Sequence, residues 1–232
     1  MSAVFSPRVE PEIFALRPDY RALSICVSSV RNTPRHALSD GLLAQAAGRN
    51  PPPPWADAHL ESWREAYRAF GAKPQRTPCS AEALIKRRAK DGCLPQVNAV
   101  VDLYNALSVW FAIPIGDENR AAYVGSPQLV RAGGQETFDT TTDGEPFAES
   151  VPAGEVVWRD TQGVTCRRWN WRQCVRTRID ESTSHMWFVL ERLEPMPVPA
   201  LLEAGERLTD ALVKLTPAAQ ITQRLIERTE DA

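Results

Sequence analysis

The spacing of hydrophobic residues divides the chain into a helical first half and a second half of short strands. Residues 20–30 are rich in Ile, Val and Cys, which predicts a buried strand. Apolar residues then recur at helical spacing, as at Leu60 and Trp63, and Gly71 ends that stripe. The pattern predicts helices over residues 34–48, 56–70, 77–90 and 97–110, with Ser80 as the N-cap of the third.

Short alternating runs and turn signals follow Pro114. Asp143-Gly144 is a tight-turn signal, and a hairpin is expected to reverse direction near Gln162. The pattern predicts strands over residues 129–132, 155–158, 163–168 and 186–191.

Prolines at 195, 197 and 199 end the strand-rich region. We expect two C-terminal helices, one with a leucine stripe from Leu201 to Leu215 and a second that begins at Pro217 and carries Ile221 and Leu225. These helices either dock on the sheet or form a dimer contact. At the other end, residues 1–19 contain three prolines and are expected to be irregular.

Charge restricts the class of partner. The net charge is −2 and the isoelectric point is near 6.0, which excludes a strongly basic nucleic-acid-binding protein but not a local basic patch. Basic residues concentrate between residues 64 and 90. They either contact RNA or complement the negative end of a helix dipole. The candidate RNA contacts are Lys73, Arg76, Lys86, Arg87, Arg88 and Lys90.

Cysteine spacing and hydropathy favour a soluble, reduced, cytoplasmic protein. The five cysteines have no CxxC spacing and no histidine pair accompanies them, so we expect no metal site and no cofactor. The N-terminus does not resemble a signal peptide, and the longest apolar runs are shorter than the roughly 20 residues of a membrane span, so no membrane partner is expected.

Residues 164–178, VTCRRWNWRQCVRTR, form the most distinctive segment. Tryptophans flank Asn170, and arginines surround them. Guanidinium groups bind phosphates or carboxylates, and indole faces stack on bases or line a pocket. Alternatively, the segment is a sheet edge whose arginines extend to solvent while the tryptophans pack in the core.

The sequence VNAVVDLYN at residues 97–105 resembles the start of the editing domain in the beta subunit of bacterial phenylalanyl-tRNA synthetase. Later features follow in the order of that domain, including LVRA at 129–132, Asp143-Gly144, Thr183 and the strand that ends at Glu191. The resemblance covers residues 21–193, between an N-terminal segment 1–20 and a C-terminal helical extension 194–232. The segments FGAKP and CRRWNWRQ are typical of a free-standing relative without an aminoacylation domain.

This resemblance implies an α+β fold with a mixed two-sheet core and flanking helices. It also implies a pocket that hydrolyses mischarged aminoacyl-tRNA, with tRNA or aminoacyl-tRNA as partner and no DNA, in a monomer or in a homodimer through the C-terminal helices. At individual pocket positions, this sequence matches the family only in part. Asn105 matches a pocket asparagine, Tyr104 replaces a threonine, Gly116 stands where the family has a histidine, and Glu191 matches the glutamate that recognises a tyrosine hydroxyl.

The glycine-rich pocket loop of the family corresponds to residues 167–172, here RRWNWR. Because indoles and guanidinium groups fill space, we expect a pocket that does not hold tyrosine. The expected catalytic or positioning residues are Asn105, Asn170 and Glu191, with Glu191 alternatively an ion-pair partner of the loop arginines. The expected substrate-binding residues are Tyr104, Arg167, Arg168, Trp169, Trp171 and Arg172.

Three functions remain open: a trans-acting deacylase, a non-catalytic tRNA- or RNA-binding module, and a small-molecule-binding domain that kept only the fold. The first two are distinguished by whether the 167–172 loop faces a pocket together with Asn105 and Glu191. His36, His59 and His185 lie in separate segments, and none is expected to act as a base.

Overall fold

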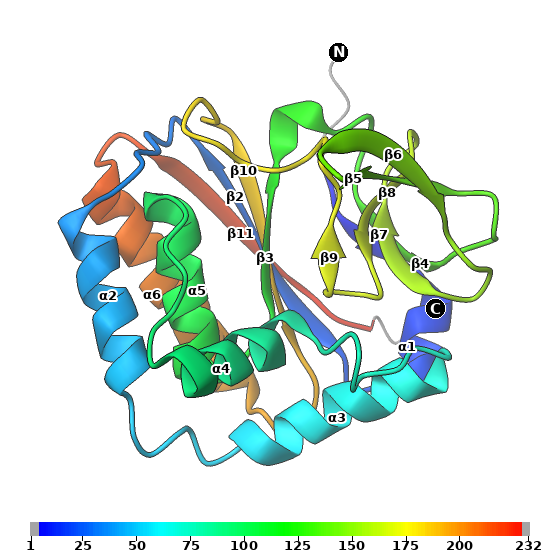
Figure 1. The fold of residues 1–232 in the computed structure, drawn as a ribbon, viewed down its shortest axis with the longest axis horizontal. Helices are drawn as coiled ribbons and strands as arrows, with labels where there is room; N and C mark the ends of the chain where they lie inside the picture. The colour runs from blue at the N-terminus through cyan, green and yellow to red at the C-terminus, as the bar shows by residue number, and fades with distance from the viewer. Residues whose placement is uncertain (1–4, 229–232) are drawn as a thin grey trace.

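The computed structural model describes residues 5–228, which form two β-sheets flanked by helices (Figure 1). This arrangement confirms the predicted α+β fold. The smaller sheet is fully antiparallel and has the order β11-β2-β10-β3, which places β3 at one edge. Its strands are β2 (Arg21–Ser28), β3 (Ile115–Asn119), β10 (Met186–Arg192) and β11 (Gln220–Ile226).

The larger sheet is mixed and has the order β1-β4-β7-β8-β5-β6, with the short strand β9 paired to β8. The pairs β1–β4 and β5–β8 are parallel, and the others are antiparallel. Its strands are β1 (Arg8–Val9), β4 (Gln128–Arg131), β5 (Thr137–Thr142), β6 (Glu145–Ser150), β7 (Val156–Arg159), β8 (Val164–Arg167) and β9 (Arg172–Gln173).

Two predicted turns are confirmed in this larger sheet. Asp143 and Gly144 join β5 to β6 and both have positive φ, as a two-residue hairpin loop requires. Residues 160–163 join β7 to β8, the hairpin expected near Gln162.

Helices α5 and α6 pack on one face of the smaller sheet, and α2 packs on α5 (Figure 1). Gly205 of α6 permits a close approach to the sheet, because a Cβ at that position would lie 2.1 Å from Cδ2 of Leu23. The helices are α1 (Pro11–Leu16), α2 (Ala37–Gly48), α3 (Ala56–Ala69), α4 (Ser80–Asp91), α5 (Ala99–Phe111) and α6 (Val198–Leu215), with a 3-10 turn at Arg120–Ala122.

A second core fills the space between the two sheets and reaches α3. It is rich in aromatic residues that pack edge to face, including Trp158 against Trp187 and Trp63 against Trp169. Trp63 and Tyr67 of α3 are fully buried, so the aromatic side of this helix belongs to the core.

Three sequence predictions are wrong. The second C-terminal helix is strand β11, in which Ile221 and Leu225 face the helix-covered core and Ile226 faces the core between the sheets. The alternation of a strand therefore accounts for apolar positions that also fit helical spacing, and α6 alone supplies the helical part of the C-terminal extension.

Residues 1–19 are not irregular throughout, because they include β1 and α1, while residues 1–4 lie outside the described part. Pro11 occupies the first turn of α1, where its missing N–H costs no helical hydrogen bond. Ser80 is not the N-cap of α4: Cys79 holds that position, and Ser80 is the first helical residue.

Candidate functional site

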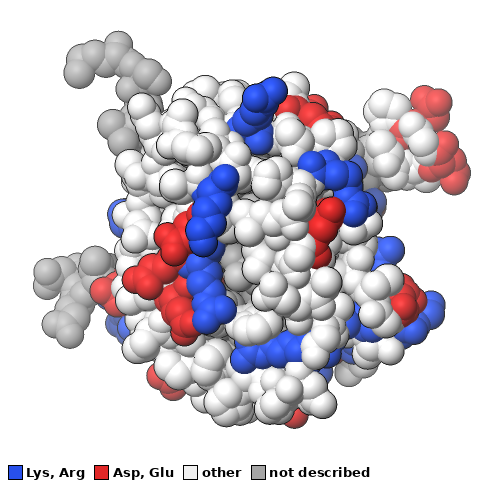
Figure 2. Space-filling model, turned by 90° about the vertical axis from the view of Figure 1, so that its left-hand side faces the viewer, with Lys and Arg blue, Asp and Glu red and all other residues white. Residues whose placement is uncertain are grey.

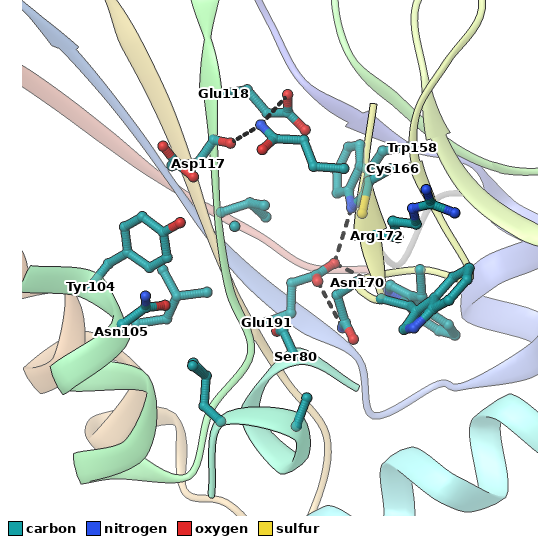
Figure 3. A pocket seen from close by; sticks show the side chains of 18 of the residues that line it. Ser80, Tyr104, Asn105, Asp117, Glu118, Trp158, Cys166, Asn170, Arg172 and Glu191 are labelled. Carbon is teal, nitrogen blue, oxygen red and sulfur yellow. Dashed lines mark hydrogen bonds between the residues drawn. The ribbon is translucent and has the colours of Figure 1, made fainter. Parts of the chain in front are cut away.

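A cavity of about 290 Å³ lies between the two sheets, at the open edge of β3 (Figure 3). Helices α4 and α5 border one side, and β7, β8 and the loop before β9 border the other. Four indoles line it, from Trp158, Trp169, Trp171 and Trp187. The polar side chains that line it are Ser80, Tyr104, Asn105, Asp117, Glu118, Cys166, Asn170, Arg172, Gln173 and Glu191.

Glu191 of β10 accepts four hydrogen bonds from other protein side chains. Its Oε1 accepts from the Tyr20 hydroxyl at 2.7 Å, the Trp169 indole at 3.1 Å and the Trp158 indole at 3.2 Å. Its Oε2 accepts from the Asn170 amide at 2.9 Å. Burial raises the pKa of Glu191 to about 7, and these donors partly oppose that rise.

No arginine is among these four donors, so the alternative in which Glu191 pairs with the loop arginines is wrong. The partners of Glu191 instead fix the wall of the cavity. Oδ1 of Asn170 accepts from the Tyr67 hydroxyl at 2.9 Å, so the Asn170 amide is held at both ends. Asn170 therefore has one defined orientation at the cavity wall.

Two consecutive residues of the 167–172 loop have left-handed backbone conformations. Arg168 has φ 47° and Trp169 has φ 68°, a region that favours glycine. Two hydrogen bonds from backbone N–H groups hold the turn: Trp169 N–H donates to the Val156 carbonyl at 2.6 Å, and Arg168 N–H donates to the Glu155 carboxylate oxygen Oε1 at 3.2 Å. The backbone of this loop therefore adopts a conformation that favours glycine although its sequence contains none.

This turn sends the bulky side chains of the loop in different directions. Arg167 is buried and forms a bidentate pair with Glu155, with both contacts at 2.8 Å, and a second ion pair with Glu149. Arg168 lies over the Trp171 ring, 4.3 Å from its centroid. Trp169 is fully buried among Tyr20, Trp63 and other aromatic residues.

Of the six expected substrate-binding residues, Tyr104, Trp169, Trp171 and Arg172 border the cavity, whereas Arg167 and Arg168 do not. The loop therefore fills less of the cavity than its composition suggests, because Arg167 turns to an ion pair and Arg168 turns outward. The alternative interpretation of this segment, in which its tryptophans pack in the core, is right for Trp169. This residue belongs to the core and also lines the cavity.

Asn105 of α5 borders the same cavity, and in residues 5–228 its side chain forms no hydrogen bond to another protein group. By contrast, Asp102, which precedes it by one helical turn, accepts a hydrogen bond from the Val97 N–H of the neighbouring loop at 2.8 Å. The Asn105 amide is therefore available to a ligand.

Sequence reasoning missed Asp117 and Glu118 of β3. Asp117 is 4% exposed, and burial raises its pKa to about 7, partly opposed by the adjacent Tyr104 hydroxyl. Burial also raises the pKa of Glu118, which accepts from the Gln173 amide at 2.8 Å. The short run IGDEN after Pro114 was the available signal, but the long apolar segment before it obscured this strand.

Two buried oxygens at the cavity, Oδ2 of Asp117 and Oγ of Ser80, have no hydrogen-bond partner within the described chain. Buried polar atoms are normally paired, because desolvation without a compensating hydrogen bond costs free energy. Both atoms are therefore unsatisfied polar groups at the cavity wall.

The expected RNA-binding residues fall into two groups. Lys73 and Arg76 border a second cavity of about 280 Å³, together with Arg168 and Glu155. The others lie on α4, where Lys86 pairs with Glu82 at 2.6 Å and Arg87 pairs with Asp91 at 3.6 Å. Arg88 donates to the carbonyls of Ala47 and Arg49 and so joins α4 to the end of α2, while Lys90 lies in the last turn of α4.

His59 is buried and satisfied, as expected. Its Nδ1 lies 2.8 Å from the Ala112 carbonyl oxygen, and its Nε2 accepts from the Trp63 indole and the Leu193 N–H. Burial lowers the pKa of His59 to about 4, so the ring is neutral at pH 7. Across residues 5–228 no three His, Cys, Asp or Glu side chains lie close enough together to hold a metal ion, and no helix is both long and apolar enough to cross a bilayer.

The structure is an α+β domain with two sheets and a cavity with polar lining residues between them. A family model described as the B3/4 domain matches residues 62–211, and the chain belongs to this family. This assignment confirms the predicted relationship to a domain family of the phenylalanyl-tRNA synthetase beta subunit.

A solved structure is also similar in fold: an N-terminal fragment of the phenylalanyl-tRNA synthetase beta subunit from Pyrococcus horikoshii, with 8% identity and a TM-score of 0.49. The comparison covers 97% of this chain and 55% of that one, so this chain spans about half the length of the fragment. No curated protein sequence matches the chain.

Proposed function

We propose that this protein is a trans-acting deacylase that hydrolyses mischarged aminoacyl-tRNA. The observation that carries the proposal is the convergence of Asn105, Asn170 and Glu191 with part of the 167–172 loop on one cavity. This is the arrangement that separates a deacylase from a non-catalytic RNA-binding module. Membership of the B3/4 family supports the same conclusion.

The reaction places modest demands on the site, because an aminoacyl ester is already activated. A water oxygen bonds to the ester carbonyl carbon, the bond from that carbon to the ribose oxygen breaks, and the ribose oxygen takes up a proton. The protein must position the ester and stabilise the developing oxyanion. The Asn105 amide and the second N–H of the Asn170 amide are the donors at the cavity suited to that role.

Glu191 acts in this proposal as a positioning residue. Its carboxylate accepts from four protein donors and holds the Asn170 amide, so it sets the direction of that amide. Removing a single oxyanion donor from a hydrolase typically lowers kcat by about 100- to 1,000-fold. We expect Asn105→Ala and Asn170→Ala each to lower kcat by about 100-fold or more.

Tyrosine is not the expected substrate. The resemblance assigns to Glu191 the recognition of a tyrosine hydroxyl, but here the protein's own Tyr20 hydroxyl makes that hydrogen bond at 2.7 Å. The indoles of Trp158 and Trp169 also donate hydrogen bonds to the same oxygen, Oε1 of Glu191. A tyrosine substrate would therefore have to displace a buried protein group.

For tRNA contact, the structure favours the cavity at Lys73, Arg76 and Arg168. This cavity and the ester site are separated by the 167–172 loop, because Arg168 borders one and Trp171 borders the other. On the face shown in Figure 2, the side of α2 and α6, the basic side chains of the described residues surround an uncharged centre or lie beside acids. That face is thus a poor match for a polyanion.

The proposal is tested by incubating the protein with a panel of individually mischarged tRNAs and following release of each amino acid. We expect hydrolysis of at least one mischarged species other than tyrosyl-tRNA(Phe). Arg168→Ala, outside the ester cavity, should retain hydrolysis of a minimal aminoacyl nucleotide, whereas Asn170→Ala should not. Rapid hydrolysis by the wild type that survives both Asn105→Ala and Asn170→Ala would remove the cavity from the mechanism.

The alternative is a non-catalytic tRNA-binding module. It is favoured by the full occupancy of the Glu191 carboxylate and by Gly116, which stands in place of the family histidine and borders the cavity. This alternative predicts saturable tRNA binding with no release from any mischarged tRNA. A small-molecule-binding domain, the third possibility, predicts ligand binding in the cavity with no affinity for tRNA.

A further inference from the structure

The cavity has an acidic side at the edge of β3. Successive side chains of a strand point to opposite faces, so Asp117 lies beside Tyr104 of α5 and Glu118 lies beside Gln173 of β9 (Figure 3). Glu118 has a protein partner, but Oδ2 of Asp117 has none among the described residues, although Asp117 is 4% exposed. A buried carboxyl oxygen that borders a cavity without a donor indicates that a ligand supplies the donor.

The charges around the cavity define what kind of donor fits. Three carboxyl groups line it, from Asp117, Glu118 and Glu191, against one guanidinium, Arg172. Arg172 is already engaged, because it donates to the Thr140 hydroxyl at 2.5 Å and lies 3.6 Å from Glu149. Burial raises the pKa of all three carboxyl groups, so a cationic ligand would favour their ionised forms and an anionic ligand would disfavour them.

The apolar walls favour the same class of ligand. The negative faces of aromatic rings attract cations, and indole is the strongest of the aromatic side chains in this respect. Four indoles border the cavity. Trp158, Trp169 and Trp187 are at most 2% exposed, whereas Trp171 is half-buried. An organic cation would therefore be stabilised by the carboxylate at one wall and by the Trp171 ring at the other.

We propose that the cavity binds its ligand through an ammonium group held by the Asp117 carboxylate. This inference rests on the proposed function for the identity of the ester and adds that Asp117 holds an ammonium group of that substrate. The ammonium is either the α-amino group of the aminoacyl moiety or the end of a basic side chain. Burial raises the pKa of Asp117 to about 7, and a bound ammonium favours its ionised form.

Four small esters distinguish recognition of the α-amino group from recognition of a side-chain amine. They are lysine methyl ester, its Nα-acetyl derivative, its Nε-acetyl derivative and the diacetyl ester. Each is titrated into the protein at pH 7.5 while tryptophan fluorescence is followed, since four tryptophans border the cavity. We expect the diacetyl ester to bind at least tenfold more weakly than the better monoacetyl ester. The monoacetyl ester that binds identifies which amine is recognised.

The proposal is overturned if the diacetyl ester binds within threefold of the others, or if none of the four gives a saturable change. This comparison uses the wild-type protein and does not depend on the folding of a variant. Asp117→Asn should then weaken binding of the preferred ester at least tenfold, whereas Asp210→Asn, an exposed acid on α6 outside this cavity, should not.

Failure of this inference and failure of the proposed function give different results. Asp117-dependent binding of an amine ester without release of any amino acid from mischarged tRNA would leave the inference standing and remove the deacylase. Conversely, deacylation that is equally fast for N-acetylated and free aminoacyl-tRNA, and unaffected by Asp117→Asn, would leave the deacylase standing and remove the ammonium site.

Discussion

The Tyr20 hydroxyl donates a hydrogen bond of 2.7 Å to Oε1 of Glu191, joining two residues that lie 171 positions apart in the sequence. Both side chains are buried, and they belong to neighbouring parts of the sheet framework, before β2 and within β10. The bond links the aromatic core between the sheets to the cavity wall, because the same carboxylate holds the Asn170 amide. A contact that supports the fold thus also occupies the position at which the resemblance would place a substrate hydroxyl.

Replacing Tyr20 with phenylalanine should lower the free energy of unfolding by about 1–3 kcal/mol, because a buried acceptor loses a donor. It should also raise the pKa of Glu191 further, since this hydrogen bond lowers that pKa. Equilibrium unfolding in urea measures the first effect. Tyr123→Phe is a matched control, because it removes a hydroxyl bonded to the neutral Thr165 hydroxyl at 3.0 Å. Equal losses in the two variants would contradict a special role for the carboxylate.

Asp117 and Glu191 each contribute a stability that declines as the pH rises. Burial raises the pKa of Asp117 from 3.8 to about 7, so the folded protein holds this proton more tightly than the unfolded chain. Its contribution is fully present below about pH 4, is lost progressively as the pH rises to about 7, and then levels off. Glu191 acts in the same direction, with its pKa raised from 4.5 to about 7.

Asp117→Asn removes one of these titrations without removing a hydrogen bond to Oδ2. The slope of unfolding free energy against pH between pH 4.5 and 6.5 should therefore be shallower than in the wild type, by up to about 1.4 kcal/mol per pH unit. Urea unfolding at several pH values measures the slope. A variant slope as steep as that of the wild type would show that Asp117 titrates normally in the folded protein.

Much of the framework follows from the local pattern, and the exceptions have physical causes. Helices α3 and α5 and strand β10 are predicted within a few residues because each buries a regular stripe or run. The segment of β11 is wrongly predicted as a helix because Ile221 and Leu225 fit both a helical and an alternating repeat. Only its pairing with β2 decides between the two. Pairing across nearly 200 residues is not encoded locally.

The candidate site likewise contains residues that the sequence predicts and residues that it does not. Asn105, Asn170 and Glu191 are predicted from the family resemblance and meet at one cavity. Asp117 is missed because an acidic residue in a short strand looks like a surface residue until β3 is placed at the sheet edge against α5. Arg167 is assigned to the substrate because one of its partners, Glu149, comes from β6, which the sequence does not predict. The predicted hairpin brings Glu155 near Arg167, but the pattern does not show that the two side chains form an ion pair.

The left-handed pair in the 167–172 loop predicts an unusual order of stability between two substitutions. Both Arg168→Gly and Arg168→Ala lose the contact with Trp171 and the ion pair with Glu155 at 3.7 Å. Only glycine relieves the positive φ of 47°. We expect the glycine variant to be more stable than the alanine variant by about 1 kcal/mol, measured by urea unfolding. An alanine variant of equal or greater stability would mean that the turn is unstrained.

The basic cavity predicts how tRNA affinity responds to salt. Lys73 and Arg76 border this cavity with Arg168, whereas Lys86 and Arg87 are neutralised by ion pairs on their own helix. Replacing Lys73 and Arg76 with alanine should weaken binding of bulk tRNA at 100 mM salt. It should also make the slope of log K against log salt shallower by about 1–2, because fewer phosphates are neutralised. Filter binding over a range of salt concentrations measures both quantities.

Lys214→Ala provides the control, because it removes one exposed charge from α6, outside this cavity, and should leave the slope unchanged. If the double variant and the control bind alike at every salt concentration, the 73–76 region is not the tRNA contact. If hydrolysis of a short aminoacyl-nucleotide substrate is nevertheless retained by the double variant while hydrolysis of full aminoacyl-tRNA is lost, the basic cavity serves affinity and the ester cavity serves chemistry. The two cavities on either side of the 167–172 loop would then have separate roles, joined by the stacked pair Arg168 and Trp171.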